Sequence, residues 1–200
     1  MLQREFTEEQ QMFRDAYRKF LAAEIVPHME AWREAGIVDR EAFRKAGEQG
    51  FLMIWPDEKY GGMGDDDFRF EQIVIEETIR HGDISLFLSL HSRLVGPYIG
   101  RLGSEELKTR LLPKCISGET ILGIAMTEPN AGSDLAGMKS RAVRDGEDWI
   151  LNGSKTYISN GINGGAFVVA ARTVPDNRHG IGLFIVESDM EGFSRGRNLK

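Results

Sequence analysis

The hydrophobic pattern of the chain changes from helical to strand-like spacing near residue 119. Before this point apolar residues recur every three or four positions, and after it they form short runs that are separated by turn residues. Helices that are followed by strands, rather than alternating with them, are typical of the α+β class with segregated domains. We therefore predict an all-α domain at residues 1–118 and a β-domain at residues 119–200.

Capping residues mark the expected starts of helices in the first domain. Thr7 and Gln10 have the spacing of a capping box, and the apolar stripe behind them is expected to end at Pro27. Further helix starts are expected at Asp39, within residues 65–67 and at Ser104.

Six short runs in the second domain predict strands: 121–126, 138–144, 149–151, 155–159, 167–172 and 181–187. Asn152-Gly153 is a strong two-residue hairpin signal, and turns are also expected at 145–146 and 160–161. If residues 155–159 form a strand, Tyr157 and Ser159 lie on the same face of it, because alternate side chains point to the same side.

Charge and cysteine content limit the classes of function. The net charge is −6 and the pI is about 5.3, so general affinity for nucleic acid is not expected. The single Cys115 excludes an intramolecular disulfide and favours a reducing compartment. No apolar run reaches the roughly 18 residues that cross a bilayer. The first 20 residues mix acids with bases, unlike a transit peptide, and together these features predict a cytoplasmic protein.

Residues 127–134, Thr-Glu-Pro-Asn-Ala-Gly-Ser-Asp, have the composition of a ligand-binding turn. Proline and small residues let the backbone bend and approach a ligand closely. The hydroxyls of Thr127 and Ser133, together with backbone N–H groups, can hold an anionic cofactor without a basic side chain. Many surface loops share this composition, with their hydroxyls bonded to the local backbone, so both interpretations remain open at this point.

A second polar segment follows at residues 149–161, Trp-Ile-Leu-Asn-Gly-Ser-Lys-Thr-Tyr-Ile-Ser-Asn-Gly. At this pair of segments the chain resembles the acyl-CoA dehydrogenase family, which has a T-E-P-x-A-G-S-D loop followed by an I-x-N-G-x-K-x-[aromatic]-I-[S/T]-N-G stretch. The resemblance extends over nearly the whole chain. Residues 125–127 and 148–155 look most like the long-chain and isovaleryl branch. Two long motifs in order are more specific than either motif alone.

The resemblance implies a fold and a reaction. The fold is an α-helical N-terminal domain followed by a partial antiparallel, β-barrel-like middle domain, with the family's C-terminal four-helix domain absent from this chain. The reaction is FAD-dependent α,β-desaturation of fatty acyl-CoA thioesters in β-oxidation, with electrons passed to an electron-transferring flavoprotein. The family also implies a homo-oligomer, either a tetramer or a dimer. Its catalytic glutamate is expected beyond Lys200, so this chain should contain no catalytic residue and be inactive alone.

The resemblance also implies which residues bind ligands. By resemblance, Thr127 would face the pyrimidine edge of the flavin, and Ser159 would lie near its N5 atom. Relatives commonly have tryptophan at the position of Tyr157 and threonine at the position of Ser159. The expected cofactor-binding residues are Ile124, Ala125, Met126, Thr127, Gly132, Ser133, Tyr157, Ile158 and Ser159. The expected substrate-binding residues, toward the CoA end of the substrate, are Ser133, Arg178 and His179, although the loop before Arg178 is shorter here.

Other polar residues are expected to have ordinary roles. Lys139, Arg141 and Lys155 are interpreted as solvated surface residues. The histidines lack the spacing of metal ligands, so no metal site is expected. Two alternative functions stay open: an acyl-CoA oxidase or flavin monooxygenase on the same scaffold, and a non-catalytic fragment or interaction module. Reoxidation of the reduced flavin in air separates the first from a dehydrogenase, and a failure to bind FAD would indicate the second.

Overall fold

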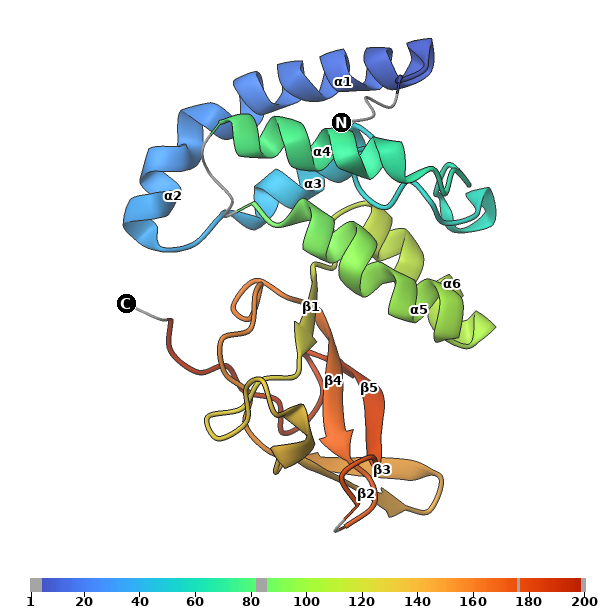
Figure 1. Cartoon of the computed structure of the whole chain (residues 1–200), viewed down its shortest axis with the longest axis vertical. Helices are drawn as coiled ribbons and strands as arrows, with labels where there is room; N and C mark the ends of the chain where they lie inside the picture. Colours follow the sequence, from blue (N-terminus) through green and yellow to red (C-terminus); the bar gives the residue numbers. More distant parts are fainter. Residues whose placement is uncertain (1–4, 82–85, 176, 199–200) are drawn as a thin grey trace. The chain divides into compact units, whose positions relative to one another are not determined.

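The computed structural model describes residues 5–81, 86–175 and 177–198, and the chain divides into two compact units between Ile121 and Leu122 (Figure 1). The first unit is helical and the second is built on a β-sheet, which confirms the α+β class. The boundary predicted from the sequence, after residue 118, lies close to this division.

The first unit begins with helix α1 (Glu8–Phe20), and its capping box is confirmed. The N–H of Gln10 donates to Oγ1 of Thr7 over 3.2 Å, and the N–H of Thr7 donates to Oε1 of Gln10 over 3.1 Å. The expected end of this helix at Pro27 is wrong. The chain continues through a π-helical turn η1 (Leu21–Ile25), a 3-10 turn η2 (Val26–His28) and helix α2 (Met29–Ala35). Pro27 is tolerated because it lies at the start of η2, where an N–H is not needed.

Further α-helices follow in the described residues of this unit: α3 (Arg40–Glu48), α4 (Phe68–Arg80), α5 (Gly96–Leu102) and α6 (Glu105–Ile116). The side chains of Asp39, Asp67 and Ser104 accept backbone hydrogen bonds at the starts of α3, α4 and α6, so the predicted helix starts are confirmed.

Helix α1 packs against α4 and a central aromatic cluster. The ring of Tyr17 lies 5.0 Å from that of Phe51, and the ring of Phe20 lies 5.2 Å from it. The Tyr17 hydroxyl is 2.8 Å from Oγ1 of Thr78 on α4, which satisfies a buried polar group. This unit therefore has a hydrophobic core of its own.

The sheet of the second unit is centred on β4 (Ala166–Arg172). Strand β1 (Leu122–Ala125) pairs with it in parallel and β5 (Ile181–Glu187) pairs with it antiparallel, so that Val168 lies opposite both Ile124 and Ile185. Strands β2 (Arg141–Asp145) and β3 (Asp148–Asn152) form an antiparallel hairpin. The sheet is thus mixed, where an antiparallel barrel-like sheet was expected, because the long segment after β1 leads the chain back to enter β4 in the same direction.

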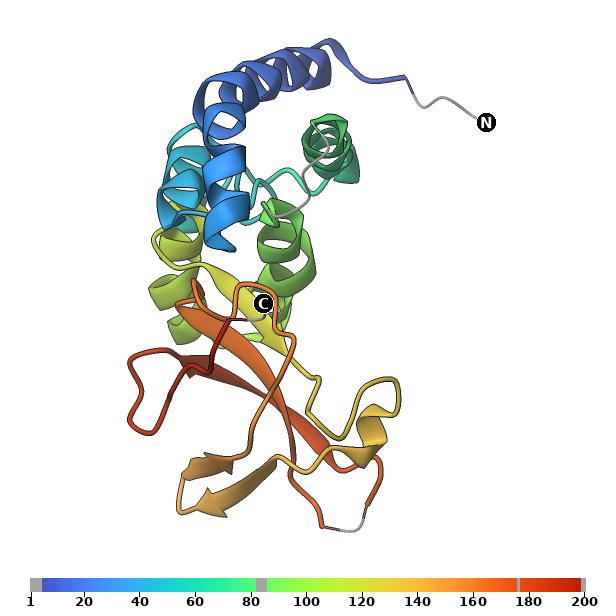
Figure 2. The same ribbon diagram turned by 90° about the vertical axis from the view of Figure 1, so that its left-hand side faces the viewer.

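The hairpin β2–β3 is joined to the rest of the sheet at its base. One registered pair, Arg141 with Arg172, links β2 to β4, and the hairpin then turns away from the sheet (Figure 2). The turn predicted at 145–146 is confirmed, with Gly146 at φ +63° between the two strands. The hairpin predicted at Asn152-Gly153 is wrong, since β3 ends at Asn152 and Gly153 lies directly against Ser140.

The strand predicted at residues 155–159 is also wrong. Tyr157 and Asn160 have φ values of 57° and 60°, in the left-handed region, so the chain turns here instead of extending. The alternation that would place Tyr157 and Ser159 on one face therefore does not apply. This segment is a second loop, held by the contacts described below.

Candidate functional site

The loop after β1 has a fixed conformation at its tip. The N–H of Glu128 donates to the carbonyl of Ala131 over 2.8 Å, and the N–H of Ala131 donates back over 3.1 Å, closing a turn around Pro129. Ala131 is buried in a small apolar cluster with Met138 and Ala170. The polar face of the loop is therefore carried on an anchored backbone.

Glu128 is the electrostatic anchor of this loop. Its buried carboxylate accepts hydrogen bonds from the N–H groups of Lys139 (2.6 Å) and Ser140 (2.9 Å) and from Nζ of Lys155 (2.8 Å). Burial alone would raise the pKa of Glu128, but these donors outweigh it and lower the pKa to about 2. Glu128 is thus ionised near neutral pH and acts as a structural acceptor.

Direct contacts join the two polar segments that the sequence singled out. The N–H of Thr156 donates to the carbonyl of Thr127 over 2.9 Å, and Nζ of Lys155 also reaches the carbonyl of Met126 at 3.0 Å. Asn160 Nδ2 donates to the carbonyl of Leu122 at the start of β1 over 2.9 Å. Hydrogen bonds thereby join residues that are more than 25 positions apart in the sequence.

The expected cofactor residues belong to the two segments that these hydrogen bonds join. Ala125 is buried in β1, and the neighbouring Ile124, Met126 and Thr127 are partly buried. In the second loop Ile158 and Ser159 are partly buried. Gly132, Ser133 and Tyr157 are exposed, with 72% of Tyr157 accessible. Within the described ranges, the hydroxyls of Thr127, Ser133 and Ser159 have no hydrogen-bond partner, so they are free to meet a ligand.

One of the expected substrate residues, Arg178, lies against the same loop. Arg178 lies 2.9 Å from Oδ1 of Asp134, the residue after Ser133. The N–H of His179 donates to Oδ1 of Asn177 over 2.9 Å, which fixes the turn between β4 and β5. Ser133, Arg178 and His179 are all exposed, as a contact site for a soluble ligand requires.

Sequence reasoning missed two residues that hold the site together. Lys155 was expected on the solvated surface, but its side chain is 11% exposed because it pairs with Glu128. Glu128 belongs to the first motif and Lys155 to the second. The presence of one opposite charge in each motif is the sequence signal that could have predicted this pair. Arg172 donates to the carbonyls of Ala136 (2.6 Å) and Met138 (3.3 Å) and so fixes the turn η5 (Leu135–Gly137). No local pattern signals that contact.

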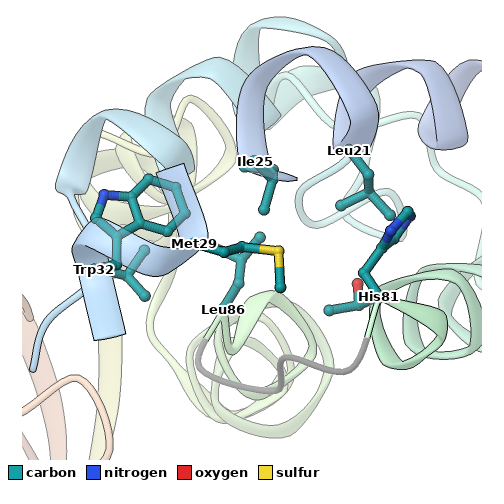
Figure 3. Close-up of a pocket in the computed structure, with 8 residues that line it drawn as sticks. Leu21, Ile25, Met29, Trp32, His81 and Leu86 are labelled. Carbon is teal, nitrogen blue, oxygen red and sulfur yellow. The ribbon is translucent and has the colours of Figure 1, made fainter. Parts of the chain in front are cut away.

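Other kinds of site find little support in the described part of the chain. It contains no group of three or more potential metal-ligating side chains, and none of its helices is long and apolar enough to cross a membrane. An apolar pocket in the helical unit has a volume of about 10 Å³ and is lined by residues that include Leu21, Ile25, Met29, Trp32, His81 and Leu86 (Figure 3). That volume is at the limit for one water molecule, so the pocket does not hold an organic ligand.

Two family models together match almost the whole chain. The acyl-CoA dehydrogenase N-terminal domain matches residues 7–119, and the acyl-CoA dehydrogenase middle domain matches residues 123–200.

Named relatives agree with these matches. The pig mitochondrial long-chain specific acyl-CoA dehydrogenase is 45% identical over 99% of this chain and 46% of its own length. The orangutan (Pongo abelii) mitochondrial isovaleryl-CoA dehydrogenase is 38% identical over 96% of this chain and 47% of its own length. The chain thus spans about half the length of these relatives, and the predicted likeness to the long-chain and isovaleryl branch is confirmed.

Solved structures show the same fold. The acyl-CoA dehydrogenase of Geobacillus kaustophilus is 48% identical, with a TM-score of 0.94 over 98% of this chain and 52% of that one. A Bacillus anthracis acyl-CoA dehydrogenase complexed with FAD is 29% identical, with a TM-score of 0.86 over 98% of this chain and 33% of that one.

The cytoplasmic location expected from the sequence is wrong, since the long-chain and isovaleryl relatives are named as mitochondrial proteins. The mixed charges near the amino terminus, which had argued against that compartment, belong to α1. There Arg14 and Arg18 pair with Glu76 and Glu77 on α4 at 2.7 Å each. The charge pattern of this segment therefore reflects helix packing and carries no information on location.

Proposed function

Because the chain belongs to the acyl-CoA dehydrogenase family, we propose that it forms the flavin-holding part of an enzyme that introduces an α,β double bond into fatty acyl-CoA thioesters. The observation that carries this proposal is the hydrogen bond from Thr156 to Thr127, which joins the two polar loops. A single loop with this composition is common. Two loops that are locked together and present free hydroxyls favour a built ligand site.

The residues of this surface fit FAD. Three hydroxyls, of Thr127, Ser133 and Ser159, offer donors that the described chain does not use, and exposed Tyr157 offers an aromatic ring. At Gly132 an added Cβ would meet no atom within 4 Å, so the backbone is open to a ligand there. Bound FAD would supply the two-electron acceptor for the desaturation.

The chain's own groups would bind and orient the reactants. The hydroxyls of Thr127 and Ser159 can donate hydrogen bonds where negative charge develops in the transition state. One such donor lowers the activation free energy by on the order of 3 kcal/mol. We assign Ile124, Ala125, Met126 and Ile158 to the packing of the cofactor. We assign Ser133, Arg178 and His179 to the polar end of the acyl-CoA.

The proton-accepting base is proposed to lie outside residues 1–200. The reaction needs a carboxylate to take the α-proton, and Glu128 is unsuited because its pKa of about 2 makes it a very weak base. By resemblance to the family, a glutamate beyond Lys200 takes this role. The same proposal includes a preference for long acyl chains, transfer of electrons to an electron-transferring flavoprotein and assembly into a homo-oligomer.

The experiment uses the chain joined to the C-terminal half of the Geobacillus kaustophilus relative. This protein is expected to bind FAD, and its flavin is expected to bleach when an acyl-CoA is added without oxygen. Slow return of the yellow colour in air favours a dehydrogenase, while fast return favours an oxidase. A folded chimera that binds no flavin contradicts the proposal.

A further inference from the structure

A basic groove lies beside the hairpin β2–β3 in the second unit. Its volume is about 540 Å³, which falls within the range of roughly 300–1,000 Å³ that is usual for small-molecule sites. The hairpin supplies lining residues from both of its strands, and β4, which is paired to β2 at Arg141 and Arg172, supplies Arg172. The η5 turn and the segment after β4, including Thr173 and Pro175, also contribute to its walls.

The groove carries an excess of positive charge. Five cationic residues line it: Lys139, Arg141, Arg144, Arg172 and Arg178. None of the described lining residues is acidic.

Within the described residues, acidic side chains offset few of these charges. Arg172 donates to carbonyls, and Arg144 donates to the carbonyl of Gly146 over 3.0 Å, so neither cation is neutralised by these bonds. Arg178 pairs with Asp134, but both side chains are more than 60% exposed, and such pairs are weak.

The strand register places two of these cations next to each other. Arg141 on β2 is the registered partner of Arg172 on β4, so two cations stand at neighbouring backbone positions beside the groove. Beside the cations stands Trp149, which is 38% exposed and has the guanidinium of Arg144 5.7 Å from its ring centre. An aromatic wall next to clustered guanidinium groups suits a ligand that combines phosphates with a planar ring.

We propose that this groove binds the phosphate groups of a small, multiply phosphorylated molecule such as inorganic diphosphate or a nucleoside diphosphate. Guanidinium groups bind phosphate and carboxylate oxygens alike through paired N–H donors, and five cations in one groove favour a ligand that carries several negative charges, as a diphosphate does. The proposal does not depend on flavin binding by the loops. The phosphates can belong to a free nucleotide or to the nucleotide end of a CoA thioester. The second source rests on the proposed function, which already assigns Arg178 to the acyl-CoA, and the choice of probes separates the two sources.

The test is calorimetric titration of the 200-residue chain with inorganic diphosphate at low salt. Arg141→Gln and Arg144→Gln are each expected to weaken binding by about tenfold, the usual worth of one charge-assisted hydrogen bond. Arg197→Gln is the matched control, because Arg197 is an exposed cation of the same unit that does not line the groove. The Arg197→Gln variant should bind diphosphate with the same affinity as the unaltered chain. Thermal unfolding of each variant verifies that the fold is kept.

Two nucleotide probes identify the source of the phosphates. Tighter binding of adenosine 3′,5′-bisphosphate than of ADP indicates the CoA end, and equal or tighter binding of ADP indicates a free nucleotide. FAD titration of the same two groove variants is the separate readout. Weakened diphosphate binding with unchanged FAD binding assigns the loss to the groove, so failure of the flavin site and failure of this site are distinguishable. The proposal is overturned if diphosphate does not bind, or if both groove variants bind it as tightly as the Arg197 control.

Discussion

The backbone N–H of Thr156 lies 2.9 Å from the carbonyl oxygen of Thr127, and this contact joins the two polar loops of the β-domain. The adjacent pair, Lys155 with Glu128, reinforces the junction at 2.8 Å with both side chains nearly buried. The loops therefore form one unit whose shape depends on a buried ion pair. Ligand binding by either loop should depend on that pair.

Replacing Lys155 by methionine should destabilise the protein by about 3 kcal/mol, because it leaves the carboxylate of Glu128 buried without its cation. Thermal or urea unfolding measures the loss, and Lys19→Met, at an exposed position of α1, is the control. The double variant Lys155→Met, Glu128→Gln should recover part of the stability, since both charges are then removed. A Lys155→Met protein as stable as the Lys19→Met control would contradict the anchoring role.

Stability should depend on pH through His91. This side chain is fully buried, which lowers the pKa of the imidazole from 6.5 to about 4, and a ring nitrogen lies 2.9 Å from the carbonyl of Cys115. Between these two values the unfolded chain binds more protons than the folded chain, so stability falls as the pH is lowered from 6.5 to 4.

The expected loss from His91 is on the order of 3 kcal/mol. Urea unfolding at several pH values measures it, and His91→Gln should flatten the profile within this window. If the unfolding free energy of His91→Gln falls between pH 6.5 and 4 as steeply as that of the unaltered protein, the pH dependence comes from other groups.

The helix starts could be predicted from the sequence because caps are local. Thr7, Asp39 and Ser104 each bond to a backbone N–H within three residues, so their spacing alone carries the signal. The α+β order followed from the hydrophobic period, and the first polar loop followed from the composition of its motif. The family resemblance supplied the cofactor and substrate residues, whose roles remain predictions.

The errors arose where distant contacts overrode local preference. Residues 155–159 have strand-like composition, yet the bonds of Lys155 and Thr156 to the first loop and the left-handed backbone at Tyr157 make a turn there. The mixed sheet likewise depends on the pairing of β1 with β4, about 40 residues apart in sequence. Neither contact leaves a trace in the local pattern, and single-sequence reasoning could not find them.

Two glycines near the site should respond differently to alanine. At Gly123 a Cβ would lie 2.8 Å from the Phe167 ring and 3.0 Å from the carbonyl of Ser159, so Gly123→Ala should cost about 2 kcal/mol of stability. At Gly132 the space is open, and Gly132→Ala should keep its stability but bind FAD more weakly if the backbone approaches the cofactor. Thermal unfolding and flavin titration of both variants test this, and equal stability of the two would contradict the packing at Gly123.

The hydroxyls of Thr127 and Ser159 should affect flavin chemistry without affecting the fold. In the chimera described above, Thr127→Ala and Ser159→Ala should each slow flavin reduction by about 100-fold, the usual effect of losing one donor at a developing charge. Stopped-flow absorbance under anaerobic conditions measures the rate. Ser154→Ala is the control, because Ser154 is exposed and outside the expected set. Rates in the two variants that match the control would exclude these hydroxyls from the reaction.

The most direct test of the flavin surface is the map of backbone amide chemical shifts when FAD is added to the isotope-labelled 200-residue chain. This measurement detects weak binding and assigns it to residues without requiring turnover. We predict that the largest changes fall in residues 124–133 and 156–159 together, and that Lys155→Met diminishes both sets. Changes confined to one segment, or located elsewhere while these two stay unmoved at saturating FAD, would contradict a shared flavin site.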